Sequence, residues 1–453
     1  MNNIYLKQKK FFQSGFTLEY NNRIEYLKKL KRVIIKNEKR IEDCLQKDLG
    51  KSSVEAYMTE IGLTLEDISF QIKNMKKNCS KIKVKTPMSQ FPSKTFQVAS
   101  PYGNVLIISP WNYPFLLSMQ PLVGAIAAGN TVILKPSEYS VNTSNIMKEI
   151  LSEVFSEDYV YTALGDSEVA SKLLSLKFDY IFFTGGTSVG KIVYESAAKN
   201  LTPVTLELGG KSPVIIEKSA KIDLACKRIV FGKYLNCGQT CVAPDYILVD
   251  KSIVEEVKAS LIKWIDVLFK DALNNNQYGN IINERHFKRL LSYLDNNEII
   301  KGGKYSESSL KIEPTLIIPN SLDEPVMQNE IFGPILPIIV YDDKKQMYDI
   351  LNKYPTPLAC YIFTTNKDFM DEVIKSYSFG GGCINDTIIH LAITGLPFGG
   401  VGSSGIGQYH GQKSFETFSH YKSIVNKSNR LDINVRYTPY NDKKEKMIKK
   451  LLH

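Results

Sequence analysis

Apolar residues near the start of the chain recur with the spacing of amphipathic helices. The repeating positions are Ile24, Leu27, Leu30, Ile34, Ile41 and Leu45. Steps of three, four and seven residues place them on one side of a helix, so we predict helices from about residue 9 to residue 77. Residues 84–101 differ, because prolines bracket the extended sequence Lys94–Val98. That stretch favours an arm or an edge strand over a helix.

From residue 105 to residue 207, short β-branched and apolar runs alternate with longer amphipathic ones. The short runs predict strands at Val105–Ile108, Thr131–Leu134, Tyr159–Thr162, Asp179–Phe183 and Pro203–Glu207. The runs between them predict helices near Leu117–Ala128, Thr143–Phe155, Ser167–Ser175 and Ser188–Lys199. Such alternation is typical of a parallel sheet with helices on both faces, which is a nucleotide-binding architecture.

Four polar or glycine positions lie at or just after the carboxyl ends of these predicted strands. They are Asn112, Lys135, Gly185 and Glu207. Ligands of open parallel sheets bind beyond the carboxyl ends of the strands. We therefore expect these four positions to converge on one edge of the sheet.

A second alternating region runs from residue 213 to about residue 407. Its predicted strands are Val214–Ile216, Tyr246–Val249, Leu336–Tyr341, Ala359–Phe363 and Gly381–Asn385. The later segment Phe418–Val425 also alternates like a strand. The overall prediction is an α/β protein with two sheet-based units and a small β arm.

Length and composition agree with a globular protein of more than one unit. The chain has 453 residues, which exceeds the size at which a single core keeps growing. Its net charge of +10 comes from lysines scattered along the whole length, a pattern that argues against a nucleic-acid partner. The seven widely spaced cysteines form no disulfide framework. We expect a cytoplasmic protein with no signal peptide and no transmembrane segment.

The last residues combine basic and apolar side chains at roughly helical spacing. Lysines at 443, 444, 446, 449 and 450 surround Met447, Ile448, Leu451 and Leu452. Two interpretations fit this pattern: a solvated last helix, or a short basic amphipathic helix in weak contact with anionic lipid. We favour the solvated helix.

Two residues between Leu201 and Asp245 offer an acid and a nucleophile. Glu207 ends a β-branched run, and Cys241 follows the polar segment Gly238–Thr240. A thiol attacks as its thiolate, so a site must activate it. A helix opening at Gly238–Thr240 would supply backbone N–H groups for the thiolate and for an oxyanion. By themselves, a lone cysteine is more often a small buried apolar residue and a glutamate a solvated one.

The segments around these residues resemble the glutamate and cysteine signatures of the aldehyde dehydrogenase superfamily. The resemblance rests on Thr205–Pro213 and Gly238–Cys241, and it extends over residues 10–440 in family order. Further matching segments are Pro110–Pro114, Leu134–Glu138, Phe183–Gly190, Glu330–Pro334 and Leu396–Gly400. Among the groups of this superfamily, the sequence is most similar to class 3, whose members oxidise medium- and long-chain aliphatic or aromatic aldehydes and are commonly dimers.

The resemblance implies a role for each candidate residue. Cys241 would attack the aldehyde, Glu207 would activate the water that releases the acid, and Asn112 would share an oxyanion with the backbone N–H of Cys241. The cofactor would be NAD, with NADP also accepted, and no metal is expected. Its implied binding residues are Trp111, Lys135, Glu138, Gly185, Gly186, Thr187, Ser188, Val189, Gly190, Glu330 and Phe332.

Each of these cofactor residues also has a plainer interpretation. The segment from Gly185 to Gly190 departs from Gly-x-Gly-x-x-Gly and would serve equally as a strand-to-helix turn with Ser188 as N-cap. Lys135 and Glu138 would form an ordinary surface ion pair. In the family, both contact the adenosine ribose, where a carboxylate disfavours a 2′-phosphate.

The family layout assigns the chain to four parts. They are a Rossmann-type NAD(P)-binding domain at 1–83 and 102–207, a catalytic domain at 208–407, an oligomerisation arm at 84–101 and 415–428, and a basic tail at 429–453. We interpret the protein as a non-acylating aldehyde dehydrogenase and a homodimer. Two alternatives remain: a CoA-acylating relative, which typically lacks the glutamate, and a binding protein that has kept the fold and lost the chemistry.

Overall fold

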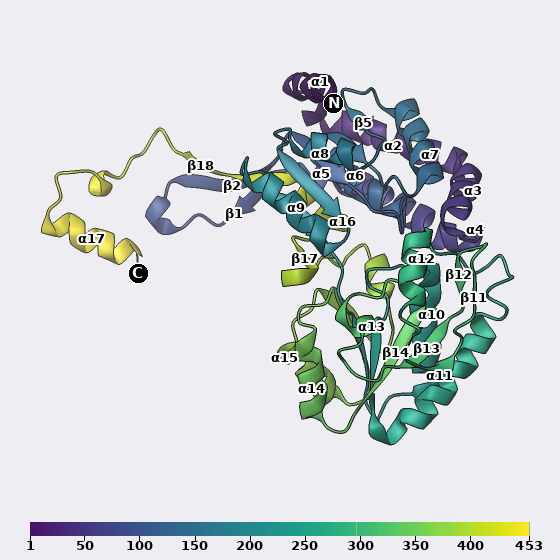
Figure 1. Cartoon of the computed structure of the whole chain (residues 1–453). Helices are drawn as coiled ribbons and strands as arrows, with labels where there is room; N and C mark the ends of the chain where they lie inside the picture. The colour runs from purple at the N-terminus through teal and green to yellow at the C-terminus, as the bar shows by residue number, and fades with distance from the viewer. Residues whose placement is uncertain (296, 453) are drawn as a thin grey trace.

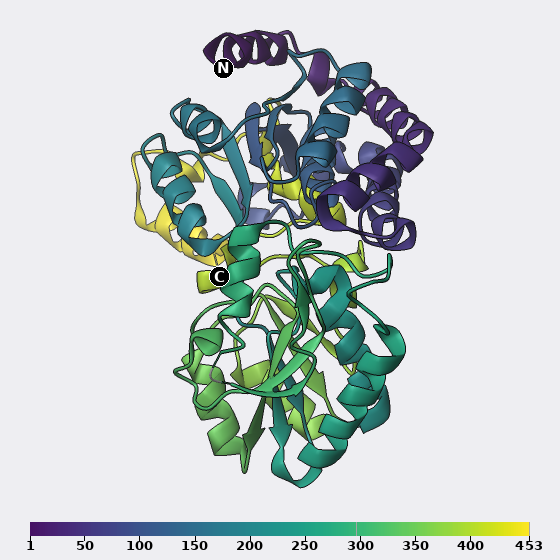
Figure 2. The same ribbon diagram turned by 45° about the vertical axis from the view of Figure 1, so that its right-hand side comes forward.

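Two helix-covered sheets form the body of the molecule, and a narrow arm projects from it (Figure 1). The computed structural model describes residues 1–295 and 297–452. Turned by 45°, the two bodies stand one above the other, with helix α12 (Glu284–Leu291) at their junction (Figure 2). Each body carries one of the two regions of alternating strands that the sequence predicts.

The first sheet has six strands in the order β17-β7-β6-β3-β4-β5. Its five parallel members are β3 (Asn104–Ile108), β4 (Thr131–Lys135), β5 (Val160–Thr162), β6 (Tyr180–Thr184) and β7 (Val204–Glu207). They confirm the predicted strands, with ends shifted by about one residue. Successive residues face opposite sides: Val105 and Ile107 of β3 enter the main core, and Leu106 enters a smaller core on the other face.

Helices cover both faces of this sheet. The smaller core lies under α1 (Asn2–Gln13), α8 (Ser167–Leu174) and α9 (Thr187–Ala198). The opposite face is covered by α6 (Leu116–Ala128) and α7 (Val141–Val154). Outside these pack the N-terminal helices α2 (Tyr20–Lys36), α3 (Glu38–Leu49), α4 (Ser53–Ala56), the π-helical η2 (Tyr57–Ile61) and α5 (Gly62–Asn78). The predicted helical region before residue 77 is therefore confirmed.

The second sheet has seven strands in the order β10-β13-β14-β9-β8-β15-β16, and only β10 is antiparallel to its neighbour. Its strands are β8 (Pro213–Ile216), β9 (Tyr246–Asp250), β10 (Glu298–Lys301), β13 (Thr315–Ile318), β14 (Ile335–Tyr341), β15 (Ala359–Phe363) and β16 (Gly381–Ile384). Its helices are α10 (Ile222–Tyr234), α11 (Val254–Leu268), α12, α13 (Pro325–Gln328), α14 (Lys344–Lys353) and α15 (Lys367–Ser376). A short hairpin, β11 (Tyr305–Ser306) and β12 (Lys311–Ile312), lies beside it.

One short strand joins the two bodies. Strand β17 (Gly405–Ile406) lies within the stretch assigned by sequence to the catalytic domain, but it pairs antiparallel with β7 of the first sheet. This approach needs glycine, because a Cβ at Gly405 would lie 2.5 Å from the carbonyl oxygen of Leu206. A strand of two residues has no periodicity to reveal it, so the predicted boundary at residue 407 missed this crossover.

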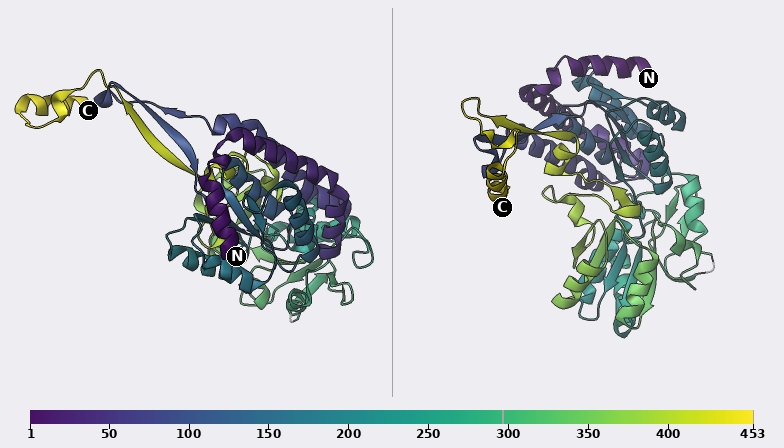
Figure 3. Two further views of the ribbon diagram at one scale, coloured as in Figure 1. Left: turned by 90° about the horizontal axis from the view of Figure 1, so that it is seen from above. Right: turned by 90° about the vertical axis from the view of Figure 1, so that its left-hand side faces the viewer.

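The arm is a three-stranded antiparallel sheet in the order β1-β2-β18. It consists of β1 (Ile82–Val84), β2 (Ser93–Pro101) and β18 (Ser419–Lys427), so it begins two residues before the predicted start at residue 84. Seen from above, the long strands β2 and β18 run out from the body together (Figure 3). Helix α16 (Gly411–Thr417) connects β17 to β18 and packs against α5 and α6.

The tail ends in helix α17 (Asp442–Leu452), at the outer end of the arm (Figure 1). It confirms the predicted last helix, although His453 lies outside the described residues. Both Met447 and Leu452 on this helix are exposed. Within the described part of the chain, no helix is both long and apolar enough to cross a membrane.

Candidate active site

Two cavities meet at Cys241 and Glu207 in the junction between the two bodies. Each has a volume of about 950 Å³, counting the part that is open to solvent, and both residues line both cavities. The first has an almost wholly apolar wall, whose members include Leu63, Leu116, Leu117, Phe231, Leu235, Ile388, Ile389, Leu391 and Phe398. The second is polar and is lined by residues that include Trp111, Asn112, Thr184, Gly185, Gly186, His286, Arg289, Glu330 and Phe332. The structure therefore brings together the predicted nucleophile and the predicted acid.

Cys241 lies in a strained loop, and the helix expected to open there is absent. Helix α10 ends before it, and the following turn η4 (Leu235–Gly238) contains Asn236 and Cys237 with φ of 52° and 53°. A turn follows, in which the N–H of Ala243 donates to the Thr240 carbonyl. Pro244 explains the error, since the residue before a proline is disfavoured in helical conformation.

Hydrogen bonds hold the strained loop in place. The N–H of Asn236 donates to Glu55 Oε1 at 2.9 Å, and its side-chain amide donates to the Asn112 carbonyl at 2.8 Å. A Cβ on Gly238, which has φ of 72°, would lie 2.3 Å from the carbonyl oxygen of Gly333. Left-handed conformations of non-glycine residues are costly and persist where surrounding contacts impose them. The loop geometry is thus fixed before any ligand binds.

Cys241 is half-buried, and its thiol lies near two carboxyl groups. Burial raises its pKa above the ordinary value, and the nearby Glu330 and Glu207 raise the pKa further. The backbone N–H groups of Cys241 and Val242 act in the opposite direction, since they stabilise the thiolate. The expected N–H donors are therefore present without a helix. A positive charge close to the sulfur would favour the thiolate.

Glu207 ends strand β7, and its carboxyl group is buried. Neither of its oxygens has a hydrogen-bond partner among the described residues. Burial raises the pKa of this carboxyl group well above its ordinary value. A raised pKa makes this carboxyl group a stronger proton acceptor, which suits a general base.

Hydrogen bonds of both the side chain and the backbone of Asn112 hold this residue between the two bodies. Its side-chain amide donates to the Gln239 carbonyl at 3.0 Å, close to Cys241 in sequence. The backbone carbonyl of Asn112 accepts hydrogen bonds from the side chains of Asn236 and Lys51, at 2.8 and 3.1 Å. The amide therefore has a fixed orientation, and it lines the polar cavity beside the thiol.

Sequence reasoning missed the ion pair behind Asn112. Lys51 and Glu60 form a salt bridge in which both side chains are fully buried. The second oxygen of Glu60 accepts the backbone N–H groups of Phe115 and Leu116, at the start of α6. A carboxylate at a helix N-terminus is stabilising, because it accepts hydrogen bonds from the first backbone N–H groups, which have no partner within the helix. Lysine and glutamate in a helical region usually predict an exposed surface, so their sequence gave no signal of this site.

The polar cavity has the features that a nicotinamide dinucleotide requires. Gly185 and Gly186 lie between β6 and the N-terminus of α9, and a Cβ on Gly186 would meet no atom within 4 Å, so a ligand can approach closely. That helix start favours phosphate. Glu330 is half-buried; its Oε1 atom is buried and has no hydrogen-bond partner among the described residues, and burial raises the pKa of its carboxyl group to about 8. An unpaired carboxyl oxygen suits the hydroxyl groups of a ribose.

Aromatic and basic side chains complete this cavity. The ring of Trp111 contacts those of Phe332 and His286, with centroids 5.3 Å away in each case. Arg289, also on α12, donates to the Ile331 carbonyl at 2.9 Å. His286 and Arg289 on α12, and Tyr293 just after it, were not predicted from the sequence, because α12 carries no family signature and reaches the cavity only through the packing of the two bodies. Thr184 lies within the matching segment Phe183–Gly190 but was not chosen as a binding residue.

Some predicted cofactor residues lie away from the wall of this cavity. The buried Lys135 ends β4 and donates to the Pro136 carbonyl at 2.8 Å and to the partly exposed Glu138 at 3.3 Å. Residues 187–190 form the first turn of α9. Within that turn Gly190 packs against Leu208, just after β7, since a Cβ there would lie 2.6 Å from Leu208 Cδ2.

Comparison with known proteins agrees with this geometry. Residues 7–424 match the family model described as "Aldehyde dehydrogenase family". The chain is 47% identical over 443 residues to a Staphylococcus aureus 4,4′-diaponeurosporen-aldehyde dehydrogenase, with 97% of this chain and 96% of that one covered. It is 43% identical to a Rattus norvegicus dimeric NADP-preferring aldehyde dehydrogenase, with 92% of each chain covered.

Solved structures give the same result. A substrate-bound Staphylococcus aureus AldH superposes with a TM-score of 0.98 at 45% identity, covering 100% of this chain and 99% of that one. An NAD⁺ complex of Staphylococcus aureus betaine aldehyde dehydrogenase has a TM-score of 0.86 at 26% identity, covering 96% and 88%. The protein is an NAD(P)-dependent oxidoreductase that converts aldehydes to carboxylic acids. The chain belongs to the aldehyde dehydrogenase family.

Proposed function

We propose that this enzyme oxidises long, apolar aldehydes, with Cys241 as nucleophile and Glu207 as the base that activates water. The observation that carries the proposal is the meeting of an apolar and a polar cavity at these two side chains. An apolar wall favours an alkyl, polyene or aryl chain, because each buried methylene contributes about 0.8 kcal/mol. The name of the Staphylococcus aureus relative gives 4,4′-diaponeurosporen-aldehyde, which has this character.

The order of events follows from the positions of the groups. The thiolate of Cys241 attacks the aldehyde carbon, and the resulting alkoxide accepts hydrogen bonds from the Asn112 amide and the Cys241 N–H. NAD(P)⁺ held in the polar cavity would supply the acceptor for the hydride that the carbon bonded to Cys241 loses, which leaves a thioester, and it would bring a positive charge into that cavity. Glu207 then takes a proton from water, whose oxygen attacks the thioester and releases the carboxylic acid. The absence of hydrogen-bond partners on Glu207 among the described residues supports this role.

The remaining predicted residues bind the cofactor in the proposed enzyme. Glu330, Phe332, Trp111, Gly185 and Gly186 hold the nicotinamide half and the phosphates, as their place on the polar cavity supports. Residues 187–190 contribute the helix start. Lys135 and Glu138 hold the adenosine ribose, and the exposed carboxylate of Glu138 favours NAD over NADP without excluding NADP.

We further propose a homodimer in the cytoplasm. The arm supports a dimer, because the β-branched residues Ile424 and Val425 are exposed on β18 and would be covered by a second subunit. The name of the rat relative includes the word dimeric. A reducing compartment suits an enzyme with a nucleophilic thiol and seven unpaired cysteines. We expect the tail helix α17 to be solvated.

The test is NAD(P)H formation by the purified protein with straight-chain and aromatic aldehydes, without CoA, beside Cys241→Ala. We expect turnover only in the wild type, with kcat/KM rising up to about fourfold for each added methylene until the chain fills the cavity. A profile that is flat or falls with chain length would contradict the apolar substrate. A strict requirement for CoA would favour the acylating alternative.

A further inference from the structure

Helix α12 lies at the junction of the two bodies (Figure 2), and two of its side chains contact rings of the first body. The imidazole of His286 contacts the ring of Trp111 in the wall of the polar cavity. One residue earlier, the guanidinium of Arg285 lies over the ring of Tyr139, with its Cζ atom 5.9 Å from the ring centroid. Tyr139 belongs to the loop between β4 and α7 and directly follows Glu138. Helix α12 thus links the polar cavity to the surroundings of Glu138.

The charge of Arg285 is not neutralised by a carboxylate. Among the described residues Arg285 forms no salt bridge, and the neighbouring Glu284 pairs with Lys288 at 3.4 Å. The guanidinium contacts His286 Nε2 at 3.4 Å, but burial lowers the pKa of this imidazole to about 4, so the ring is uncharged at neutral pH. Both Arg285 and Tyr139 are exposed. A guanidinium with free N–H groups is therefore available to a ligand.

The carboxylate of Glu138 makes such a cation relevant to the choice of cofactor. Glu138 pairs with the buried Lys135 at 3.3 Å, so the two charges offset each other. NADP differs from NAD by one phosphate on the adenosine ribose, and a phosphate monoester carries between about 1.5 and 2 negative charges at neutral pH. Beside Glu138 alone, this group would meet a repulsive carboxylate. Arg285 supplies a further positive charge next to it.

We propose that Arg285 binds the 2′-phosphate of NADP and that the Tyr139 ring holds the guanidinium in place. This inference rests on the proposed assignment of Lys135 and Glu138 to the adenosine ribose. A guanidinium presents parallel N–H donors that match phosphate oxygens, and it stacks on an aromatic ring at the same time. NAD has a 2′-hydroxyl group instead, whose hydrogen bond Glu138 accepts. The enzyme thus accepts both cofactors, each through a different charged side chain.

The test is fluorescence titration with NADPH and with NADH in the absence of aldehyde. It measures binding alone, so its result does not depend on the proposed nucleophile or substrate. In Arg285→Gln we expect the Kd for NADPH to rise about tenfold, because a charge-assisted hydrogen bond is lost, and the Kd for NADH to stay within about twofold. Arg285→Lys keeps the charge without the planar fork, so the Kd for NADPH should rise about threefold. Adenosine 2′,5′-bisphosphate, used as a competitor, should weaken by the same factors as NADPH.

Tyr139 offers a second variant on the other body. In Tyr139→Ala the guanidinium loses its ring, so the Kd for NADPH should rise about threefold while that for NADH stays within about twofold. Tyr139→Phe keeps the ring and should bind NADPH like the wild type. Because Arg285 and Tyr139 are exposed, added salt should weaken NADPH binding more than NADH binding, and this difference should shrink in Arg285→Gln.

Lys288→Gln is the matched control, because it also removes one positive charge from α12. Lys288 is exposed and paired with Glu284, and we expect no change in the ratio of the two Kd values. Equal weakening of NADPH and NADH in Arg285→Gln would place Arg285 at a part that both cofactors share, and would overturn the proposal. An unchanged Kd for NADPH, or an equal effect in Lys288→Gln, would also overturn it. If Arg285→Gln changes the ratio and Glu138→Gln does not, Arg285 keeps its role and the proposed role of Glu138 fails.

Discussion

The polar and apolar cavities differ in chemistry although they share Cys241 and Glu207. The polar one is built from strand ends, a helix start and α12, and it contains unpaired oxygens, aromatic rings and an arginine. The apolar one is lined by helices α5, α6 and α10 together with the segment 388–398, and it offers almost no polar surface. Charged and uncharged parts of the reaction are thereby held apart, and chemistry occurs where the two walls meet. Each wall can be altered without touching the other.

The largest effect is expected where both cavities meet. Cys241→Ala removes the nucleophile and should reduce turnover by on the order of 10⁴-fold or more, because no covalent intermediate can form. NAD(P)H binding, measured by fluorescence titration, should stay within about twofold of wild type, since the polar wall is intact. Loss of cofactor binding together with activity would show that the two walls are not independent.

Glu207→Gln should affect the second half of the reaction. Replacing the carboxylate with a similar amide should slow thioester hydrolysis by about 10²- to 10³-fold, the usual range for a general base. Stopped-flow measurement should then show a burst of NAD(P)H followed by a slow steady state. If the burst disappears as well, Glu207 acts before hydride transfer. An unchanged steady state, where deacylation limits the rate, would exclude it from the mechanism.

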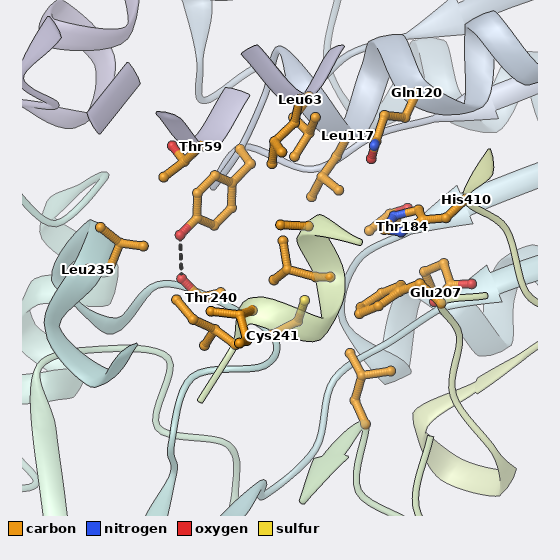
Figure 4. Close-up of a pocket in the computed structure, with 18 of the residues that line it drawn as sticks. Thr59, Leu63, Leu117, Gln120, Thr184, Glu207, Leu235, Thr240, Cys241 and His410 are labelled. Atoms are coloured by element: carbon orange, nitrogen blue, oxygen red, sulfur yellow. Dashed lines mark hydrogen bonds between the residues drawn. The ribbon is translucent and has the colours of Figure 1, made fainter. Parts of the chain in front are cut away.

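A charge placed on the apolar wall should impair the reaction of long aldehydes and leave the polar cavity unaffected. Leu235 lies across the cavity from Glu207 (Figure 4). Leu235→Asp should lower kcat/KM for a long aldehyde by about 30-fold, because the chain would lie against a charged group. Acetaldehyde should change by less than about threefold, and Leu235→Met serves as the control. An equal loss for both aldehydes would mean that this wall does not contact the substrate chain.

Glu138→Gln tests the polar side of the comparison, namely the preference between NAD and NADP. Removal of the carboxylate should reduce repulsion of a 2′-phosphate and lower the KM for NADP by about fivefold relative to that for NAD. Steady-state kinetics at fixed aldehyde would measure the ratio of the two KM values. No change in that ratio would place the adenosine ribose away from Glu138.

The smallest effect concerns pH and stability. Because the pKa of Asp67 is raised from 3.8 to about 7, the folded protein holds a proton in this window that the unfolded chain has released. Stability from this group therefore falls as pH rises through the window. Asp67→Asn cannot lose that proton, so its Tm relative to wild type should rise by roughly 1–3 °C between pH 5 and pH 8. Scanning calorimetry at both pH values measures this, and an unchanged Tm difference would show that Asp67 is ionised throughout.

The sequence predicted the fold where patterns are long and local. The five parallel strands of the first sheet, five of the seven strands of the second, and the convergence of Asn112, Gly185 and Glu207 follow from alternation and from the rule that ligands bind at strand ends. Strands β10 and β13 of the second sheet were missed. The resemblance supplied the pairing of Cys241 with Glu207, which lie in different bodies and share no local pattern.

The features that were missed depend on tertiary packing. Strand β17 has two residues, and Pro244 outweighed the helix expected at Cys241. The buried Lys51–Glu60 pair and the carboxylate of Asp67 look like ordinary helix-surface charges in sequence. The pair is buried only when η2 packs on the start of α6, and Asp67 of α5 only when α5 packs against α6 and α16. Buried charges of this kind mark function only once their surroundings are known.

The most direct test of the central claim is to trap the acyl-enzyme. Glu207→Gln would be mixed with a long-chain aldehyde and NAD⁺, quenched in acid, and analysed by intact mass and peptide mapping. The account predicts a mass gain equal to the acyl group, located on the peptide that contains Cys241, with one NADH formed for each labelled site. An acyl label on another residue, or continued NADH formation without any label, would contradict it.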